Sequence, residues 1–141
     1  MNAQELAQAS VNKMLSKDKF SEWLGIEVVE IKPGFSKLKM QIREEMLNGF
    51  DILHGGVSFS LADSALAFAS NSHGRLSLAI EAGMSFPKAV LVNDVITATA
   101  NQVSLTNKLG TYDIKIHNQK NELVGLFKGT VYRTSKNIVD E

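Results

Sequence analysis

The chain has 141 residues, 44% of them hydrophobic, and this predicts a single domain, residues 1–141, with a substantial core. Lys plus Arg and Asp plus Glu both number 15, so the formal charge is zero and neither nucleic acid nor an anionic membrane is an expected partner. The absence of cysteine excludes disulfides, thiolate zinc sites and a cysteine nucleophile. With no secretory signal pattern and no apolar run long enough to cross a bilayer, we expect a cytoplasmic protein.

The first segment, residues 3–24, has the spacing of an amphipathic helix. Apolar residues recur among polar ones at helical intervals, namely Ala7, Val11, Met14, Leu15 and Leu24. The polar stretch at residues 16–18 predicts a break within this helix. We expect residues 1–24 to form a helical extension that packs on the rest of the domain or covers it.

Residues 26–31 and 35–42 predict a β-hairpin. Pro33 and Gly34 lie between the two arms, where proline presets one turn dihedral and glycine accepts a positive one. In the second arm, apolar and polar residues alternate with the period of a sheet that has one wet face.

Residues 76–86 show the longest alternation in the chain and predict a strand. One face of this strand should carry Leu76, Leu78, Ile80, Ala82, Met84 and Phe86. Residues 95–105, 111–118 and 123–133 predict three further strands, and the short polar turns between them indicate antiparallel neighbours. We expect the polar tail, residues 135–141, to fray.

Between the predicted strands, residues 57–72 are apolar around nearly the whole circumference of a helix. A helix of this kind is typically buried. Its length of roughly 24 Å matches the width of a small sheet and is too short for a membrane core. The predicted fold is therefore α+β, with an antiparallel sheet wrapped around one central helix.

Asp63 is the only Asp, Glu, Lys or Arg between Ile52 and Gly74, and it lies in the middle of this helix. Burial of an unpaired carboxylate is costly and raises its pKa, so a charge at this place is a candidate functional group. The alternative is a structural role, with Asp63 on a wet face or accepting hydrogen bonds from Ser60 and Ser64.

The triplet His54-Gly55-Gly56 precedes the apolar helix and has no side chain on either glycine to block a ligand. Free N–H groups at a helix N-terminus, together with the helix dipole, stabilise developing negative charge. We therefore interpret this segment as a candidate oxyanion hole, although paired glycines also form plain loops and helix caps.

Helix geometry separates these two candidate groups. Asp63 follows Gly55 by eight residues, so their backbones lie ~12 Å apart at ~1.5 Å rise per residue. Both groups must approach one reacting carbonyl to within about 3 Å in order to act on it together. We therefore predict an obligate dimer in which Gly55 of one chain and Asp63 of another form each of two shared sites.

The chain resembles the hotdog-fold acyl-CoA thioesterases, in particular the phenylacetic acid degradation branch. The resemblance covers roughly residues 20–133 and is most specific between residues 48 and 72. The segments that carry it are Asn48-Gly49, His54-Gly55-Gly56, Ser60-Leu61-Ala62-Asp63-Ser64-Ala65, Asn71-Ser72 and Thr97-Ala98-Thr99-Ala100.

The resemblance implies that Asp63 is the catalytic carboxylate and that the Gly55 N–H polarises the thioester carbonyl. His54 and Asn48 would orient the thioester or the water from the opposing subunit. The resemblance also implies homodimers paired through their sheets, commonly assembled into tetramers, an acyl-CoA substrate, and no metal or cofactor. Without the resemblance, Asn48 reads as a turn residue and His54 as a partner for a backbone carbonyl.

Three residues are candidates for substrate binding, namely Gly56, Phe59 and Lys88. Phe59 would line an acyl pocket, or it would belong to the core. Lys88 is the natural partner for CoA phosphates in the loop of residues 86–89, or it is solvated. This loop reads Phe-Pro-Lys-Ala where the family usually has an Arg-Pro arrangement, and Asn93-Asp94 replaces the usual Gly-Asp.

The predicted reaction is thioester hydrolysis of an aromatic acyl-CoA such as phenylacetyl-CoA or hydroxyphenylacetyl-CoA. Asp63 would act either as a general base toward water or as a nucleophile that forms a transient anhydride, and both alternatives stay open. Two other functions also stay open, a hotdog enoyl-CoA hydratase or dehydratase and a non-catalytic acyl-CoA binding protein. Neither a Gly-x-Ser-x-Gly motif nor a nucleotide-binding glycine motif is present.

Overall fold

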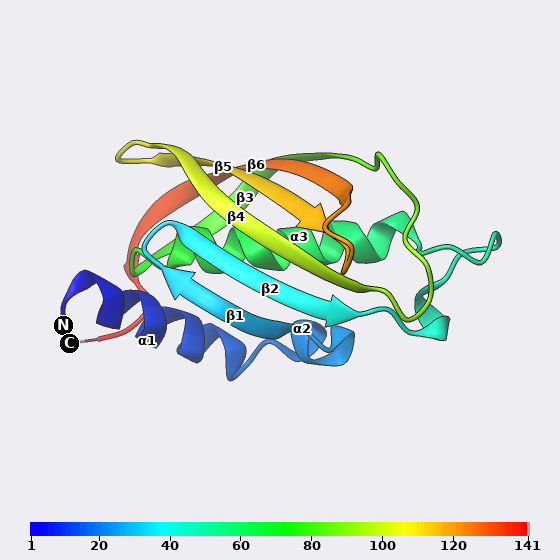
Figure 1. The fold of residues 1–141 in the computed structure, drawn as a ribbon. Coiled ribbons are helices and arrows are strands. Elements are labelled where there is room, and N and C mark those ends of the chain that lie inside the picture. Colours follow the sequence, from blue (N-terminus) through cyan, green and yellow to red (C-terminus); the bar gives the residue numbers. More distant parts are fainter. Residues whose placement is uncertain (141) are drawn as a thin grey trace.

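A computed structural model describes residues 1–140, in which an antiparallel sheet of six strands wraps one long helix (Figure 1). The strand order is β1-β2-β4-β5-β6-β3, so β1 and β3 are the two edges of the sheet. The strands are β1 (Glu27–Lys32), β2 (Phe35–Gln41), β3 (Arg75–Ser85), β4 (Val95–Leu105), β5 (Leu109–His117) and β6 (Leu123–Asn137). The predicted α+β hotdog architecture is confirmed.

The hairpin of β1 and β2 closes where the sequence predicts it. Gly34 has a φ of 72°, which glycine adopts without steric cost, and a Cβ at this position would lie 2.7 Å from Gln102 Oε1. Its N–H donates to Ser72 Oγ at 2.8 Å, so the turn is fastened to the end of the central helix.

The central helix, α3 (Gly55–Asn71), begins two residues earlier than predicted, because His54 caps it by accepting the Gly56 N–H. Leu61, Ala65 and Phe68 are fully buried against the sheet. The prediction that this helix is buried on every side is wrong, however, because one of its faces stays open. This face contains exposed Gly56 and Asp63 and half-buried Phe59, Ser60 and Ala67.

The N-terminal segment forms two helices, α1 (Ala3–Leu15) and α2 (Lys19–Leu24), which confirms the predicted break. Ala7 and Val11 of α1 are fully buried, and α1 contacts both β1 and α3. A short 3-10 helix, η1 (Glu44–Met46), precedes the loop that projects from one end of the molecule (Figure 1).

The predicted apolar face of β3 is wrong, because the register of β3 against β6 shifts at Ile80. On the helix side of the sheet, Ala79 pairs with Val131 and Ala82 with Gly129, whereas Leu78 pairs with exposed Tyr132. A bulge adds one residue and so reverses the side-chain alternation beyond it. The residues predicted to share a face therefore lie on both.

The tail is more ordered than the sequence predicts. Strand β6 continues to Asn137, which pairs with Arg75, and the Ile138 N–H donates to Gly74 O at 2.9 Å. The expectation of fraying is therefore wrong for residues 135–138, and Glu141 lies outside the described residues.

Two further features bear on function. Within residues 1–140, no helix is both long and apolar enough to cross a membrane. The same residues contain no cluster of three or more His, Cys, Asp or Glu side chains that could hold a metal ion.

Candidate active site

Asp63 lies on the open face of α3, and within residues 1–140 its carboxylate has neither a hydrogen-bond donor nor an ion-pair partner. The two neighbouring serines bind elsewhere: Ser60 Oγ donates to Gly56 O at 2.8 Å, and Ser64 Oγ pairs with Ser21 Oγ at 2.9 Å. The structural alternative in which these serines hold Asp63 is therefore wrong. Asp63 is exposed in the single chain, as the wet-face alternative expects.

The surroundings of Asp63 nevertheless remove part of its water. Partial burial raises the pKa of the Asp63 carboxyl group above its ordinary value, because desolvation disfavours the charged form. Desolvation is the only cause of this shift among the described residues, although Lys13, Lys17 and Lys136 line the same groove. Such a carboxylate is more basic than a solvated one, which suits either proton removal or nucleophilic attack.

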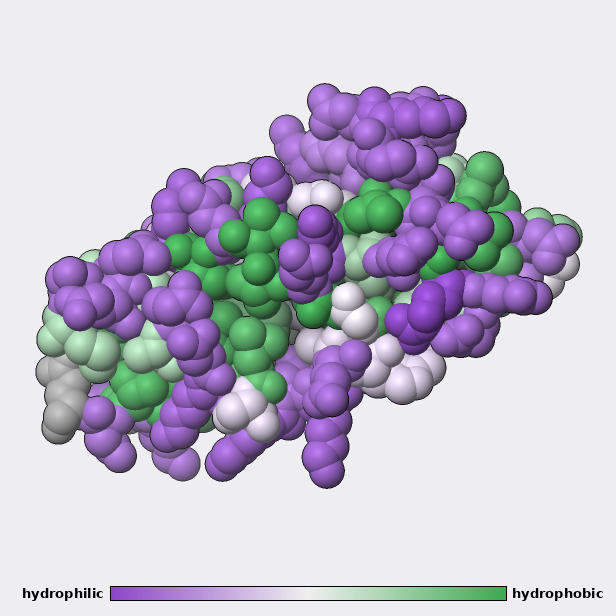
Figure 2. Space-filling view, turned by 60° about the horizontal axis from the view of Figure 1, so that its bottom comes forward, coloured by the Kyte–Doolittle hydropathy of each residue, from purple (hydrophilic) through white to green (hydrophobic). Residues whose placement is uncertain are grey.

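A groove of about 490 Å³, here called the Asp63 groove, runs beside this carboxylate. Segments from α1, α3, β3 and β6 form its walls, including Lys13, Met14, Asp63, Leu66, Leu76, Leu78, Val131 and Ile138. Figure 2 shows hydrophobic surface exposed between hydrophilic side chains on one face of the molecule. No pattern in the sequence predicts the walls that come from α1 and from residues 136–138, although the amphipathic pattern of residues 3–24 includes Met14.

The N-terminus of α3 offers a free backbone donor at Gly55. His54 Nδ1 accepts the Gly56 N–H at 3.0 Å, and His54 O accepts the Val57 N–H at 2.9 Å. The Gly55 N–H has no acceptor among residues 1–140. The helix dipole adds partial positive charge at this end of α3, so the Gly55 N–H can bind an oxyanion.

A second cavity of about 270 Å³, here called the Gly55 cavity, lies at this end of α3. It brings together three residues that the sequence predicts as site residues, Asn48, Gly55 and Lys88. Phe86, predicted on the apolar face of the strand at residues 76–86, also lines this cavity. A Cβ on Gly55 would lie 3.3 Å from Phe86 Cε1, so glycine at this position leaves room for the ring.

Asn48 organises the loop in front of the cavity. Its Oδ1 accepts the N–H of Phe50 at 2.8 Å and that of Ile52 at 3.4 Å, so the predicted alternative of a turn role is present. Within the described residues its Nδ2 has no acceptor, and Asn48 lines the cavity. The side chain can therefore shape the loop through its oxygen and donate to a ligand through its nitrogen.

The non-catalytic alternative for His54 is a bond to a backbone carbonyl. In the structure His54 instead accepts a hydrogen bond from the backbone N–H of Gly56. Acceptance at Nδ1 requires this nitrogen to carry no proton, which favours the neutral tautomer with the proton on Nε2. His54 thus caps the helix and presents an N–H donor on its other side.

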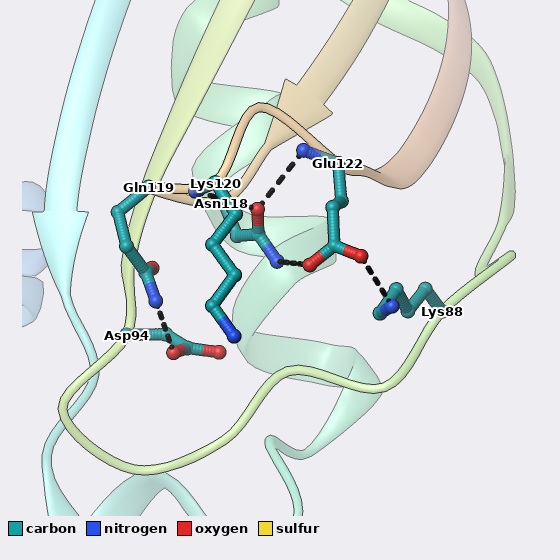
Figure 3. A network of polar contacts seen from close by, with 6 residues as sticks. All are labelled: Lys88, Asp94, Asn118, Gln119, Lys120 and Glu122. Atoms are coloured by element: carbon teal, nitrogen blue, oxygen red, sulfur yellow. Dashed lines mark hydrogen bonds and ion pairs between the residues drawn. The ribbon is translucent and has the colours of Figure 1, made fainter.

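The remaining predicted substrate-binding residues are engaged with protein. Gly56 uses its N–H in the His54 cap, and a Cβ there would lie 3.1 Å from His54 Nδ1. Phe59 packs edge to face on Phe127, with the ring centroids 5.1 Å apart, and lines neither cavity. Lys88 forms an ion pair with Glu122 (Figure 3).

Asp63 and Gly55 thus line different cavities of the same chain. Because α3 is one continuous helix, the eight residues between them set their backbones about 12 Å apart. The expectation that one chain does not bring both groups to one point agrees with this arrangement. The dimer that would bring them together stays a prediction.

Comparison with known proteins identifies the family. Residues 50–125 match the model of the thioesterase superfamily. A relative from Archaeoglobus fulgidus described as a putative esterase is 44% identical over 87% of this chain and 80% of its own. The acyl-coenzyme A thioesterase PaaI of Escherichia coli is 36% identical over 96% of each chain.

Solved structures show the same relationship. The E. coli PaaI protein from the phenylacetic acid degradation operon superposes with a TM-score of 0.94, at 34% identity, and covers 96% of this chain and 99% of that one. The chain therefore belongs to the thioesterase superfamily and is a thioester hydrolase with the hotdog fold.

Proposed function

We propose that this protein hydrolyses aromatic acyl-CoA thioesters to a free acid and CoA, with Asp63 as the catalytic carboxylate. The observation that carries this proposal is a carboxylate of raised pKa, unpaired within residues 1–140, beside a largely apolar groove. The groove suits a flat apolar acyl group. The E. coli relative is named an acyl-coenzyme A thioesterase and belongs to a phenylacetic acid degradation operon, which favours an aromatic acid.

The proposed chemistry divides between two groups. Asp63 either removes a proton from a water molecule that attacks the thioester carbonyl, or attacks the carbonyl itself to form an anhydride that water then hydrolyses. In both routes the carbon–sulfur bond breaks, and the thiolate of CoA leaves and takes up a proton. The Gly55 N–H donates to the carbonyl oxygen as it becomes negative, an interaction typically worth about 3 kcal/mol. Asn48 Nδ2 and His54 Nε2 are proposed to orient the thioester or the attacking water, while Gly56, Phe59 and Lys88 are proposed to bind the remainder of the substrate.

A difference between the two edges of the sheet, β1 and β3, supports a dimer that would bring Asp63 of one chain to Gly55 of the other. The β1 edge is short and charged, and Gln4 of α1 covers it by donating to Ile31 O at 2.8 Å. The β3 edge has 11 residues and exposes Leu78 and Ile80 by 54% and 60%. A long apolar edge pairs readily with another strand, so we propose that β3 pairs with β3 of a second copy. Two such dimers would then form the proposed tetramer.

The test of this function is the nearly isosteric change Asp63→Asn, assayed by thiol release from phenylacetyl-CoA. Loss of a general base or nucleophile should reduce turnover about a hundred- to ten-thousandfold, with the fold and assembly intact. Asp113→Asn, at an exposed position of β5, removes the same charge elsewhere and should leave turnover unchanged.

Unchanged turnover in Asp63→Asn would refute the assignment of Asp63. Two parallel assays separate the competing functions. Water addition to crotonyl-CoA without thiol release would indicate a hydratase, and binding of acyl-CoA without any product would indicate a non-catalytic binding protein.

A further inference from the structure

An ion pair connects two distant segments at the wall of the Gly55 cavity. Lys88, in the loop between β3 and β4, lines this cavity, and its Nζ donates to Glu122 Oε2. Glu122 lies in the turn between β5 and β6, two residues before Val124, which lines the same cavity (Figure 3). The pair therefore places a cation at the wall of the cavity that Gly55 also lines.

Glu122 is held by its own turn, independently of Lys88. Asn118 Nδ2 donates to Glu122 Oε1 at 3.0 Å, and Asn118 Oδ1 accepts the N–H groups of Lys120 and Glu122, each at 3.0 Å. Within residues 1–140, by contrast, Glu122 is the sole acceptor for Lys88 Nζ. If the pair opens, Lys88 is the side chain that is released.

The electrostatics of the turn favour an anion at this place. Hydrogen bonds from Lys88 and Asn118, together with the charges of Lys88 and Lys120, lower the pKa of Glu122. In the view of Figure 3, Lys120 extends from the same turn between Asp94 and Lys88. The side chains of Lys88 and Glu122 are 51% and 37% exposed, and ion pairs this open contribute little to stability. Another anion can therefore replace Glu122 at small cost.

We propose that Glu122 occupies the anion position of a phosphate-binding site formed by Lys88 and Lys120, and that a phosphate of CoA displaces it when substrate binds. This inference rests on the proposed function, because it takes acyl-CoA as the ligand. The 3′-phosphate monoester of CoA and its diphosphate as a whole each carry about two negative charges, against one on a carboxylate, so either group attracts both lysines more strongly. Glu122, kept nearby by Asn118, then repels the phosphate, so it weakens the hold on CoA and favours product release.

Equilibrium binding of CoA, measured by calorimetry, tests the proposal without any turnover. Glu122→Gln keeps an oxygen for the Asn118 amide but removes the charge, so CoA should bind about two- to fivefold more tightly. Lys88→Met should weaken binding by a similar factor. Glu27→Gln removes one carboxylate from the distant Glu27–Lys39 pair on β1 and should have no effect. These differences should shrink as salt is added.

Kinetics with two substrates then test whether a phosphate of CoA causes these changes in affinity. For acyl-CoA, Glu122→Gln should lower KM and strengthen inhibition by CoA, and Lys88→Met should raise KM. For the corresponding acyl-pantetheine thioester, which lacks every phosphate, neither change should alter KM. CoA and 3′-dephospho-CoA, compared in the binding experiment, distinguish the 3′-phosphate from the diphosphate as the group that displaces Glu122.

Each outcome decides between the proposals. Equal CoA affinity in wild type and Glu122→Gln, or weaker binding in Glu122→Gln, overturns the displacement of Glu122. Equal effects on acyl-CoA and acyl-pantetheine overturn it as well. If wild type binds CoA with the predicted differences but releases no thiol from any acyl-CoA, the phosphate site stands and the proposed hydrolysis fails.

Discussion

The Asp63 groove and the Gly55 cavity differ in what each one lacks. The groove has a carboxylate of raised pKa and apolar walls, and Gly55 is absent from its lining. The Gly55 cavity has a free N–H, an amide and a lysine, and Asp63 is absent from its lining. Each region supplies one half of the chemistry of thioester hydrolysis. One helix thus presents its two candidate groups to different cavities, and the proposed second copy of the chain would join them.

The largest expected effect follows from keeping the half-sites apart. Ile80→Lys places a charge on the exposed β3 edge, where it should prevent strand pairing between copies and reduce thiol release to background. Val29→Lys is the matched control, because Val29 is also exposed and lies at a register shift on the β1 edge. Light scattering should report monomers for Ile80→Lys alone. A fully active monomer would disprove the shared site.

The next largest expected effect is the loss of turnover when the Gly55 N–H donor is removed. Gly55→Pro removes the N–H at the first helical position, which tolerates proline, and His54 already has backbone angles that suit a residue before proline. Turnover should fall about a hundred- to a thousandfold, as for loss of one oxyanion donor. Gly55→Ala adds a similar Cβ next to Phe86 but keeps the N–H, so it should retain far more activity. Equal losses in both variants would assign the effect to crowding.

A mixing experiment tests whether Gly55 and Asp63 of different chains act together. When Asp63→Asn and Gly55→Pro chains are unfolded together and refolded, about half of the dimers should be mixed, and each mixed dimer should contain one intact site. Thiol release should therefore recover to about a quarter of the wild-type value. Either variant refolded alone provides the control. No recovery, in a mixture that size measurements show to be dimeric, would place both groups in one chain.

The smallest effect is on stability. Because burial raises the pKa of Asp63, its charged form is less favourable in the folded chain than in the unfolded chain. This penalty is present above the raised pKa and disappears as the pH falls below it. Asp63→Asn should therefore raise Tm slightly at pH 7, and the gain should shrink as the solution is acidified. A lower Tm at neutral pH would indicate a structural role for the carboxylate.

The same carboxylate sets the expected pH dependence of turnover. Whether Asp63 is a base or a nucleophile, only its ionised form reacts, so kcat should fall as the pH drops through its raised pKa. The Tm gain of Asp63→Asn and the kcat of the wild type should therefore both decrease as the pH falls through this one range.

Local patterns were enough to predict the elements that carry the half-sites. The turn at Gly34, the break at residues 16–18 and the helix with a lone Asp63 each depend on neighbouring residues, so their signals lie close together in the sequence. The separation of Gly55 from Asp63 was likewise predictable, because the rise of an α-helix is fixed.

The tertiary structure decided what depends on residues far apart in the chain. The bulge at Ile80 arises in pairing with β6, and it reversed the predicted faces of β3. Phe86 lies over Gly55, and Lys88 pairs with Glu122, only because the sheet brings their loops together. Local sequence patterns therefore establish which groups are available and how far apart the helix holds them. Register and packing determined which side chains surround each group, because these depend on contacts that no local pattern encodes.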